Sequence, residues 1–360
     1  MAADQCLIRP YEPADRDGFL DLYETVWGHA RDGDWFDWRF RENPYRDGVQ
    51  MIVADHGGEI VGAEPLLPFR LRAGTSTVDA YQPVDWLVHP DHRRQGVFTR
   101  MTERLLDRYT DDADFVFNFP NDALLPGLEK FDWRLVGDLP TSYRVQNPRP
   151  LVYDTVGETT ATAVSPLLTA ATTVTRQGLS LLDRFSRPPD AVTVERYSSV
   201  PTDLLESVYT SAPPDRIHVP RDEAFLRWRF DNPNWETRSY VASRDGDPVA
   251  SVVTATERVD DCTTTMLLDC QPATGYATRP DAVEALLVRI LRDNRDVDVL
   301  KTLGWLATRL RRRYGFLNDS AVSLSRFSTI SQAAVRPLRD GGGLDAPDPW
   351  QINGLDVTDP

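Results

Sequence analysis

The spacing of hydrophobic and polar positions predicts a mixed α/β unit in the first part of the chain. Apolar residues recur at helical spacing through residues 14–27, and again at Val97, Met101 and Leu105, just after Gly96. A shorter helix is expected at 122–131. Runs typical of strands lie at 6–10, 49–55, 59–71, 77–88, 114–119, 133–137 and 141–146. This order of elements fits one α/β domain of ordinary size.

Part of this pattern occurs a second time further along the chain. Residues 38–44 resemble 228–233, since both contain Trp-Arg-Phe followed by Asn-Pro. A single offset then aligns 53–55 with 241–243 and 58–61 with 246–249, and 130–133 resembles 313–316. Trp-Arg-Phe and Asn-Pro are also ordinary sequences for a helix followed by a turn. Four matches in the same order nevertheless favour two copies of one fold.

The repeat sets the expected domain boundaries. We expect a first domain over residues 5–148 and a second copy over 191–330. Between them, residues 149–190 contain a Thr- and Ala-rich stretch and an amphipathic stretch, which predict a helical connector. Residues 331–360 are expected to form a turn-rich C-terminal tail.

The charge of the chain limits the classes of partner that we expect and indicates the kind of organism from which it comes. The formal net charge is -15, with 41 Asp and 14 Glu residues, and only Lys130 and Lys301 among the 40 basic residues are lysines. An excess of Asp over Lys suits a protein that stays soluble in concentrated salt, so we infer a halophilic source. Nucleic acid is not an expected partner, because its binding requires a basic face.

No run of about 18 apolar residues occurs, so no membrane-spanning helix is expected. The first residues lack the basic and apolar regions of a secretory signal. The three cysteines, Cys6, Cys262 and Cys270, form an odd set without short spacing, which is typical of a reducing compartment. We therefore expect a cytoplasmic protein. Cys262 and Cys270 are interpreted as strand residues, although a disulfide between them is an alternative.

The most informative chemistry lies where the strand ending at Val88 meets the following helix. A helix N-terminus offers free backbone N–H groups and the positive end of the helix dipole to an anion. Gly96 lets the backbone approach a phosphate closely, and Arg93 and Arg94 add positive charge. A solvated helix cap is the alternative interpretation. His89 and His92 are interpreted as turn residues rather than as a metal pair, so no metal is expected.

Residues 87–98 resemble the acetyl-CoA signature of the GCN5-related N-acetyltransferases (GNATs), Arg/Gln-x-x-Gly-x-Gly/Ala after a strand. Arg93 takes the first position of the signature and Gly96 the central one. Phe98 stands at the last position, where the family has Gly or Ala, and is tolerable if its ring points away from the pyrophosphate. The resemblance covers residues 5–148 and, more faintly, 192–330. It implies the mixed α/β acyl-CoA N-acyltransferase fold, in two tandem copies of which the second is degenerate.

The resemblance also implies acetyl-CoA as co-substrate and a set of binding residues. Backbone N–H groups from Gln95 to Thr99 would hold the pyrophosphate, and Leu87 and Val88 would pair with the pantetheine amide. Asn121 would help to hold the cofactor, or it simply caps the next helix. The expected cofactor-binding residues are Leu87, Val88, Arg93, Arg94, Gln95, Gly96, Val97, Phe98, Thr99 and Asn121.

In this family an amine attacks the thioester directly, which requires a base, an oxyanion donor and an acid. Asp85 is the candidate base, with an outward, solvated carboxylate as the alternative, and the backbone N–H of Val88 is the candidate oxyanion donor. Leu128 stands where the family often has the Tyr that acts as general acid. Tyr109 or Tyr143 could replace that Tyr, and the sequence favours neither.

The second copy lacks an equivalent signature, because Gln271 and Gly275 are one residue too far apart and the next helix begins only near Pro280. We expect it to bind no cofactor and to form a wall of the acceptor cleft. The resemblance thus implies N-acetylation of a primary amine on a small molecule or peptide. A non-catalytic acyl-CoA-binding or partner-binding protein is the alternative. The acidic charge disfavours a transferase that uses aminoacyl-tRNA.

Overall fold

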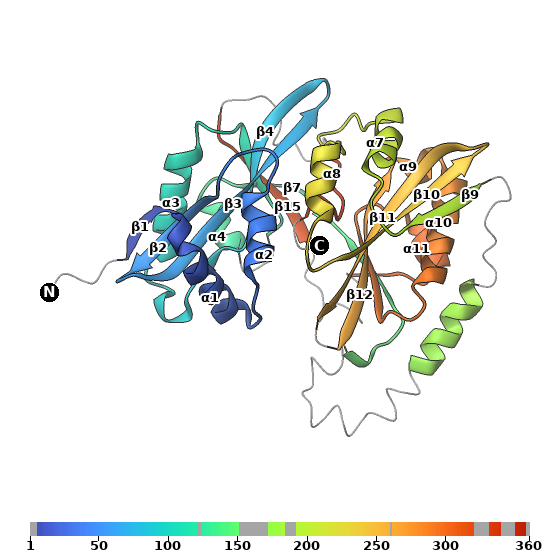
Figure 1. Ribbon diagram of the computed structural model, residues 1–360, viewed down its shortest axis with the longest axis horizontal. Coiled ribbons are helices and arrows are strands. Elements are labelled where there is room, and N and C mark those ends of the chain that lie inside the picture. The colour runs from blue at the N-terminus through green and yellow to red at the C-terminus, as the bar shows by residue number, and fades with distance from the viewer. Residues whose placement is uncertain are drawn as a thin grey trace.

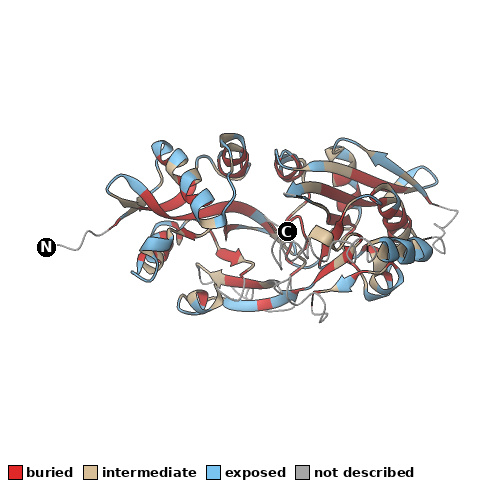
Figure 2. Cartoon of the chain, turned by 90° about the horizontal axis from the view of Figure 1, so that it is seen from below, coloured by how far each residue is buried: buried red, intermediate tan, exposed pale blue. Residues whose placement is uncertain are grey.

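The computed structural model of the 360-residue chain describes residues 6–120, 124–150, 172–183, 192–259, 261–319, 331–339 and 350–357. It contains two mixed sheets that lie side by side, each covered by helices (Figure 1). The strands are largely buried, and the helices are exposed on their outer sides (Figure 2). The two-copy α/β architecture expected from the sequence is thereby confirmed. Among the described residues, no helix is long and apolar enough to span a membrane.

The first sheet has the order β1-β2-β3-β4-β6-β15-β7, with β5 paired to β3. Its strands are β1 (Leu7–Pro10), β2 (Gln50–His56), β3 (Glu59–Ala73), β4 (Ser76–Pro83), β5 (Leu87–Val88), β6 (Phe115–Asn118), β7 (Arg134–Leu139) and β15 (Ser331–Pro337). The β4–β6 pair is parallel, and the other pairs are antiparallel.

Helices cover both faces of the first sheet, as the alternation along its strands requires. On β2, Met51 and Val53 face the core that contains α1 (Arg16–Trp27), whereas Ile52 and Ala54 face the core that contains α3 (Val97–Tyr109). The remaining helical segments are η1 (Pro13–Asp15), α2 (Gly33–Phe36), η2 (Asp37–Arg41), η3 (Pro90–His92) and α4 (Leu125–Glu129).

The second sheet repeats this arrangement in the order β14-β8-β13-β12-β11-β10-β9. Its strands are β8 (Thr141–Val145), β9 (Thr193–Tyr197), β10 (Glu236–Arg244), β11 (Asp247–Val259), β12 (Cys262–Gln271), β13 (Val299–Leu303) and β14 (Leu317–Asn318). Its helices are α7 (Thr202–Ser211), α8 (Glu223–Phe230), α9 (Gly275–Thr278), α10 (Pro280–Asp293) and α11 (Thr308–Arg313). A further helix spans 172–183. Cys262 and Cys270 both lie in β12 and are free thiols, as expected.

The two sheets exchange one strand each, so they do not divide at the boundaries expected from the sequence. Pro140 alone separates β7, in the first sheet, from β8, which pairs with β13 and β14 in the second. In return β15, from the segment expected to be a tail, lies between β6 and β7 of the first sheet. The boundaries at 148 and 331 therefore do not separate the folding units. Hydrophobic alternation identifies a strand but not its partner, which explains the difference.

The repeated Trp-Arg-Phe segments pack against each other at the seam between the copies. The rings of Trp38 and Trp228 are stacked, with centroids 6.3 Å apart. The indole Nε1 of Trp38 donates to the carbonyl of Trp228 at 2.5 Å, and the Nε1 of Trp228 donates to the carbonyl of Trp38 at 2.9 Å. The guanidinium of Arg229 lies over both indoles and over that of Trp235. These Trp residues thus pack at the seam between the two copies.

One acidic side chain is buried in the core of the first copy. Glu64, on β3, accepts a hydrogen bond from the hydroxyl of Thr102 on α3 at 2.8 Å. Its second oxygen has no hydrogen-bond partner in the part of the chain that the structure describes. Complete burial raises the pKa of Glu64 well above its usual value, because the charged form cannot be solvated. Glu64 is therefore expected to be neutral in the folded state.

This burial predicts a pH-dependent stability. Above about pH 4.5 the unfolded chain releases the Glu64 proton that the folded chain keeps, so stability falls as the pH rises towards the folded-state pKa. Glu64→Gln, which is always neutral, should lack this loss, at most about 1.4 kcal/mol per pH unit. Urea unfolding at about pH 5 and pH 8 measures it. Glu59→Gln, an exposed site on the same strand, is the control. A Glu64→Gln profile parallel to that of wild type would contradict the prediction.

Candidate functional site

The loop before α3 has the backbone geometry of an anion-binding helix start. Gly96 is the N-cap residue of α3 at φ 77°, and no side chain caps the helix. Arg94 also has a positive φ, 60°. The first-turn N–H groups of this 13-residue helix thus remain available to a ligand. Because Gly96 has no side chain, a ligand can come close to these groups. The helix start predicted just after Gly96 is confirmed.

Two side chains fix the shape of this loop. The Nε of Arg93 donates to the carbonyl of Val88 at 3.0 Å, and the Nε2 of Gln95 donates to the carbonyl of Asp91 at 2.7 Å. The side chain of Gln95 therefore supports the loop internally, while its backbone N–H lies at the helix start. Gly96 is exposed, so a ligand can reach the helix start from solvent.

A cleft opens where β4 and β6 separate. The two strands pair only at Ala80–Phe115 and Tyr81–Val116, and β4 ends at Pro83. After this break β5 pairs with β3 but not with β6. The resulting cleft has a volume of about 720 Å³, a size that suits a small-molecule or cofactor site. Its walls comprise Val26, Trp27, Gln82, Pro83, Val84, Asp85, Trp86, Val88, Arg93, Asn118, Phe119, Leu124 and Val357.

Comparison with known proteins relates the part of the chain that contains this loop and cleft to a known family. Residues 7–136 match the family model described as an acetyltransferase (GNAT) domain. This part of the chain is therefore similar to a GNAT domain. The matched residues contain β1 to β6 and the first half of β7, including the loop before α3 and both strands that bound the cleft. A search of the curated proteins found no match.

Solved GNAT structures extend the likeness to both copies. A GCN5-related N-acetyltransferase from Anabaena variabilis ATCC 29413 aligns over 93% of this chain and 73% of its own, with 11% identity and a TM-score of 0.61. A probable N-acyltransferase from Enterococcus faecalis V583 aligns over 92% and 72%, with 10% identity and a TM-score of 0.62. A tandem GNAT protein from the clavulanic acid biosynthesis pathway aligns over 94% and 100%, with 13% identity and a TM-score of 0.57. At such identities these structures establish a shared fold.

The structure brings Asp85, Val88 and Arg93 of the predicted GNAT site together in the cleft. The N–H of His89 donates to the carbonyl of Val61 on β3, so the alternation of an antiparallel pair turns the amide of Val88 away from β3. The side chain of Leu87 is buried in the core, and the same alternation turns its N–H towards β3, so Val88 is the residue of β5 whose amide is placed to meet a ligand. These placements agree with a role of β5 as a backbone partner of an extended cofactor arm.

Asp85 differs from the sequence prediction in two respects. It lies between β4 and β5, not within a strand, and its φ of 46° is strained for a residue with a side chain. Its carboxylate is paired with the Nε of Arg39 at 2.8 Å, with 7% of the Asp85 side chain exposed and 1% of that of Arg39. The alternative of an outward, solvated carboxylate is therefore wrong. The predicted 77–88 strand ignored this break, although Pro83 lies within the run and cannot donate to a strand ladder.

The remaining signature residues surround the start of α3. Val97 is buried under the helix, Thr99 is half-buried in the first turn, and Arg94 is exposed. The ring of Phe98 packs against Trp86 at 5.4 Å and Phe131 at 6.5 Å. The ring therefore lies between Trp86 of the cleft wall and the segment after α4. Asn121 lies outside the described residues.

No tyrosine occurs among the described residues that line the cleft. Leu128 is buried in the core at 1% exposure. Tyr109 packs against Tyr81 at the other end of α3, and Tyr143 lies in β8 of the second sheet. Neither tyrosine therefore replaces the family's acid in this arrangement.

The sequence prediction missed several residues of the cleft. Val357 reaches the first copy from the C-terminal end, where the amide of Gln82 donates to the carbonyl of Asp356 at 3.1 Å. Trp86 carries an indole N–H that is buried and has no hydrogen-bond partner among the described residues. A buried donor in a cleft wall is suited to a carbonyl of a bound ligand. The position of Trp86 next to Asp85 in the sequence was a hint that Trp86 belongs to the site. The contact between the segments of Gln82 and Asp356, some 270 residues apart, could not be predicted from the sequence.

In the second copy, the gap that corresponds to this cleft is filled by the chain itself. β12 and β13 pair as far as Leu267 and Thr302. Beyond that point the N–H of Leu355 donates to the carbonyl of Leu268 at 3.0 Å, and Gly304 lies close to the carbonyl of Ile352. The buried guanidinium of Arg221 holds this segment through Asp356 at 2.7 Å. The segment 352–356 thus occupies the edge of β12 that corresponds to the cleft edge of the first copy.

Proposed function

We propose that the first copy binds acetyl-CoA and transfers its acetyl group to a primary amine of a small molecule or peptide. The observation that carries the proposal is the alignment of three features in one place. An uncapped helix start lies at Gly96, β5 offers backbone partners, and the β4–β6 cleft is lined by Asp85. This arrangement fits the pyrophosphate, pantetheine and thioester parts of one extended molecule.

The proposed reaction is a direct transfer. The nitrogen of the amine attacks the thioester carbonyl, a C–N bond forms, and the C–S bond breaks to release the CoA thiolate. The N–H of Val88 stabilises the developing oxyanion. Asp85 accepts the proton of the attacking amine, directly or through water, and the thiolate takes a proton from water. Arg39 holds the carboxylate in place.

The second copy serves as a wall in this proposal. The segment 352–356 already pairs with β12, so a pantetheine arm has no open strand edge to bind there. The same segment continues to Val357, which lines the cleft of the first copy. We therefore assign cofactor binding to the first copy alone and acceptor contacts to both. The proposed setting is a salt-rich cytoplasm, which the acidic composition suits.

Release of free thiol from acetyl-CoA in the presence of a panel of amines, in high salt, tests the proposal. Calorimetry with CoA measures binding separately. A non-catalytic acyl-CoA-binding protein is the second candidate, because Leu128 stands where an acid is usual and is buried. Binding without thiol release for any amine would support that candidate. Absence of CoA binding would exclude both.

The role of Asp85 makes a sharper prediction. Asp85→Asn should lower kcat about 100-fold or more, because the base is lost, and should leave the Kd for CoA unchanged. Asp79→Asn, on the neighbouring strand β4 and half-exposed, is the matched control. Since removal of one partner leaves the Arg39 charge buried, the double variant Arg39→Met/Asp85→Leu keeps the fold testable. Activity of that double variant at the wild-type level would contradict the assignment.

A further inference from the structure

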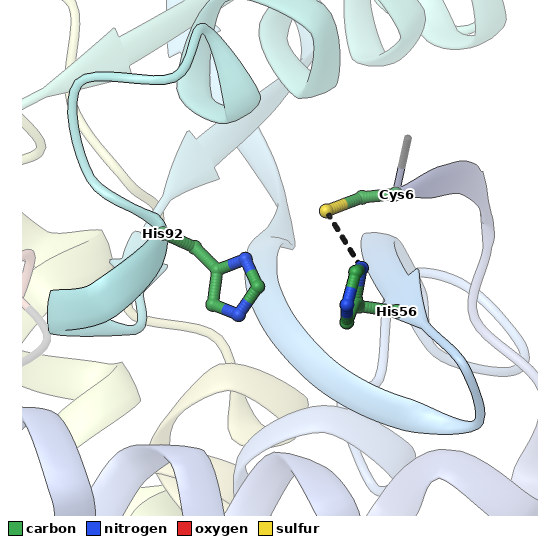
Figure 3. Close-up of side chains that lie close together, drawn as sticks. All are labelled: Cys6, His56 and His92. Atoms are coloured by element: carbon green, nitrogen blue, oxygen red, sulfur yellow. Dashed lines mark hydrogen bonds between the residues drawn. The ribbon is translucent and has the colours of Figure 1, made fainter. Parts of the chain in front are cut away.

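Three potential metal ligands converge behind the anion-binding loop. Cys6 immediately precedes β1, His56 is the last residue of β2, and His92 is the last residue of η3. Figure 3 shows the three side chains directed towards one another from these separate segments. Sequence spacing does not group them, because the three residues lie far apart along the chain.

The backbone of the fold holds these residues together. Leu7 on β1 pairs with Asp55 on β2, so Cys6 and His56 are the next residues across the same antiparallel ladder. The N–H of His89 donates to the carbonyl of Val61 on β3, which places the η3 turn over the β2–β3 hairpin. The guanidinium of Arg100 on α3 donates to the carbonyl of Cys6 at 3.2 Å. The cluster is therefore built by paired strands and a fixed turn.

The distances between donor atoms are close to those of a metal site. The Sγ of Cys6 lies 3.9 Å from the Nδ1 of His56, and the three ligand atoms all lie within 4.8 Å of one another. The rings of His56 and His92 have centroids 5.0 Å apart. In a tetrahedral zinc site the donor atoms are about 3.4–3.7 Å apart. Side-chain rotations of the two histidines would close the difference.

The donor set selects the class of metal. A thiolate and two imidazoles are soft or borderline ligands, which favour Zn²⁺ over Mg²⁺ or Ca²⁺. Cys6 is buried at 8% exposure, and His56 and His92 are half-buried, so an ion would be shielded but reachable. Three protein ligands leave a fourth position for water. We propose that Cys6, His56 and His92 bind one Zn²⁺ ion and thereby tie the anion-binding loop to the edge of the first sheet.

Metal titration of the full-length protein tests the site without any substrate. The wild type should bind one equivalent of Zn²⁺ in competition with a chromophoric chelator. Cys6→Ser, His56→Ala and His92→Ala should each weaken Zn²⁺ binding by about tenfold or more. Cys262→Ser and His29→Ala, which change the same residue types elsewhere, should bind as the wild type does. Circular dichroism confirms that each variant is folded.

Cobalt reports the identity of the sulfur ligand. Co²⁺ bound to the wild type should give a thiolate-to-metal charge-transfer band in the near ultraviolet. The band should disappear in Cys6→Ser and persist in Cys262→Ser. Failure of the wild type to bind Zn²⁺, or a Co²⁺ band that persists in Cys6→Ser, would overturn the proposed site.

The proposed effect of the ion on the loop before α3 rests on the proposed function, and the affinity for CoA measures it separately. His92 directly precedes Arg93, so a bound ion would restrict the segment that leads to the helix start. CoA should therefore bind several-fold more tightly to the Zn²⁺-loaded wild type than to the metal-free form, and this gain should be absent in His92→Ala. Equal affinities would overturn the tie while the titration still decides the metal site. Loss of CoA binding in both forms would instead count against the proposed function.

Discussion

Gly96→Glu is expected to abolish measurable binding of CoA, with a loss of about 100-fold or more in affinity. Gly96 adopts a φ of 77°, where a side chain costs about 1–2 kcal/mol. The new carboxylate would also lie at the positive end of α3, where it takes the place of the phosphate and repels it. The strain lowers the stability of the folded loop, whereas the carboxylate acts on binding, for which a 100-fold loss in affinity corresponds to about 2.7 kcal/mol. Calorimetry with CoA gives the number directly.

A matched glycine separates this effect from general damage to the fold. Gly74, between β3 and β4, also has a positive φ, 60°, and its surroundings are equally open. Gly74→Glu thus introduces the same strain and the same charge at a hairpin tip. It should lose similar stability and keep its affinity for CoA. If both variants bound CoA as the wild type does, the helix start at Gly96 would not be the phosphate site.

The loop before α3 was predictable because the residues that specify its conformation are close together in the sequence. About a dozen residues contain the end of a strand, two arginines and a glycine, and the apolar spacing of a helix begins directly after them. Backbone rules applied to such a stretch predict both the helix start and the free N–H groups. The structure adds the detail that Arg93 is bonded to the carbonyl of Val88, which the sequence could not show.

The surroundings of Asp85 were not predictable, because they depend on contacts between distant segments. Arg39 belongs to the repeated Trp-Arg-Phe stretch, which the sequence marked only as a repeat. That its guanidinium pairs with Asp85 follows from the packing of η2 against the break after β4. Val357 reaches the cleft from the opposite end of the chain. Periodicity carries no information about such long-range neighbours.

The exchange of β8 and β15 was unpredictable for the same reason, since it depends on pairing between distant segments. This exchange also has a consequence for the unfolding of the protein. Each sheet is complete only when the other half of the chain supplies a strand. Neither copy can then unfold without removing an interior strand from its neighbour. We expect the two copies to unfold in a single cooperative transition, as domains with independent cores would not.

The seam tryptophans should contribute most to that shared stability. Trp38→Ala and Trp228→Ala are each expected to lower the free energy of unfolding by about 3–5 kcal/mol, the usual cost of removing a buried aromatic side chain. Each substitution also removes one of the two reciprocal indole hydrogen bonds. Urea denaturation measures the change, and Trp27→Ala, at an indole that is 48% exposed, should cost about 1 kcal/mol or less.

The double variant Trp38→Ala/Trp228→Ala tests whether the two indoles act together. Because each ring packs on the other and bonds its partner's backbone, the first substitution already removes part of what the second would lose. The combined loss should therefore be smaller than the sum of the single losses by about 0.5–3 kcal/mol. A strictly additive cycle would mean that each indole is held by its own copy. Two separate unfolding transitions in either single variant would show that the exchanged strands alone do not couple the copies.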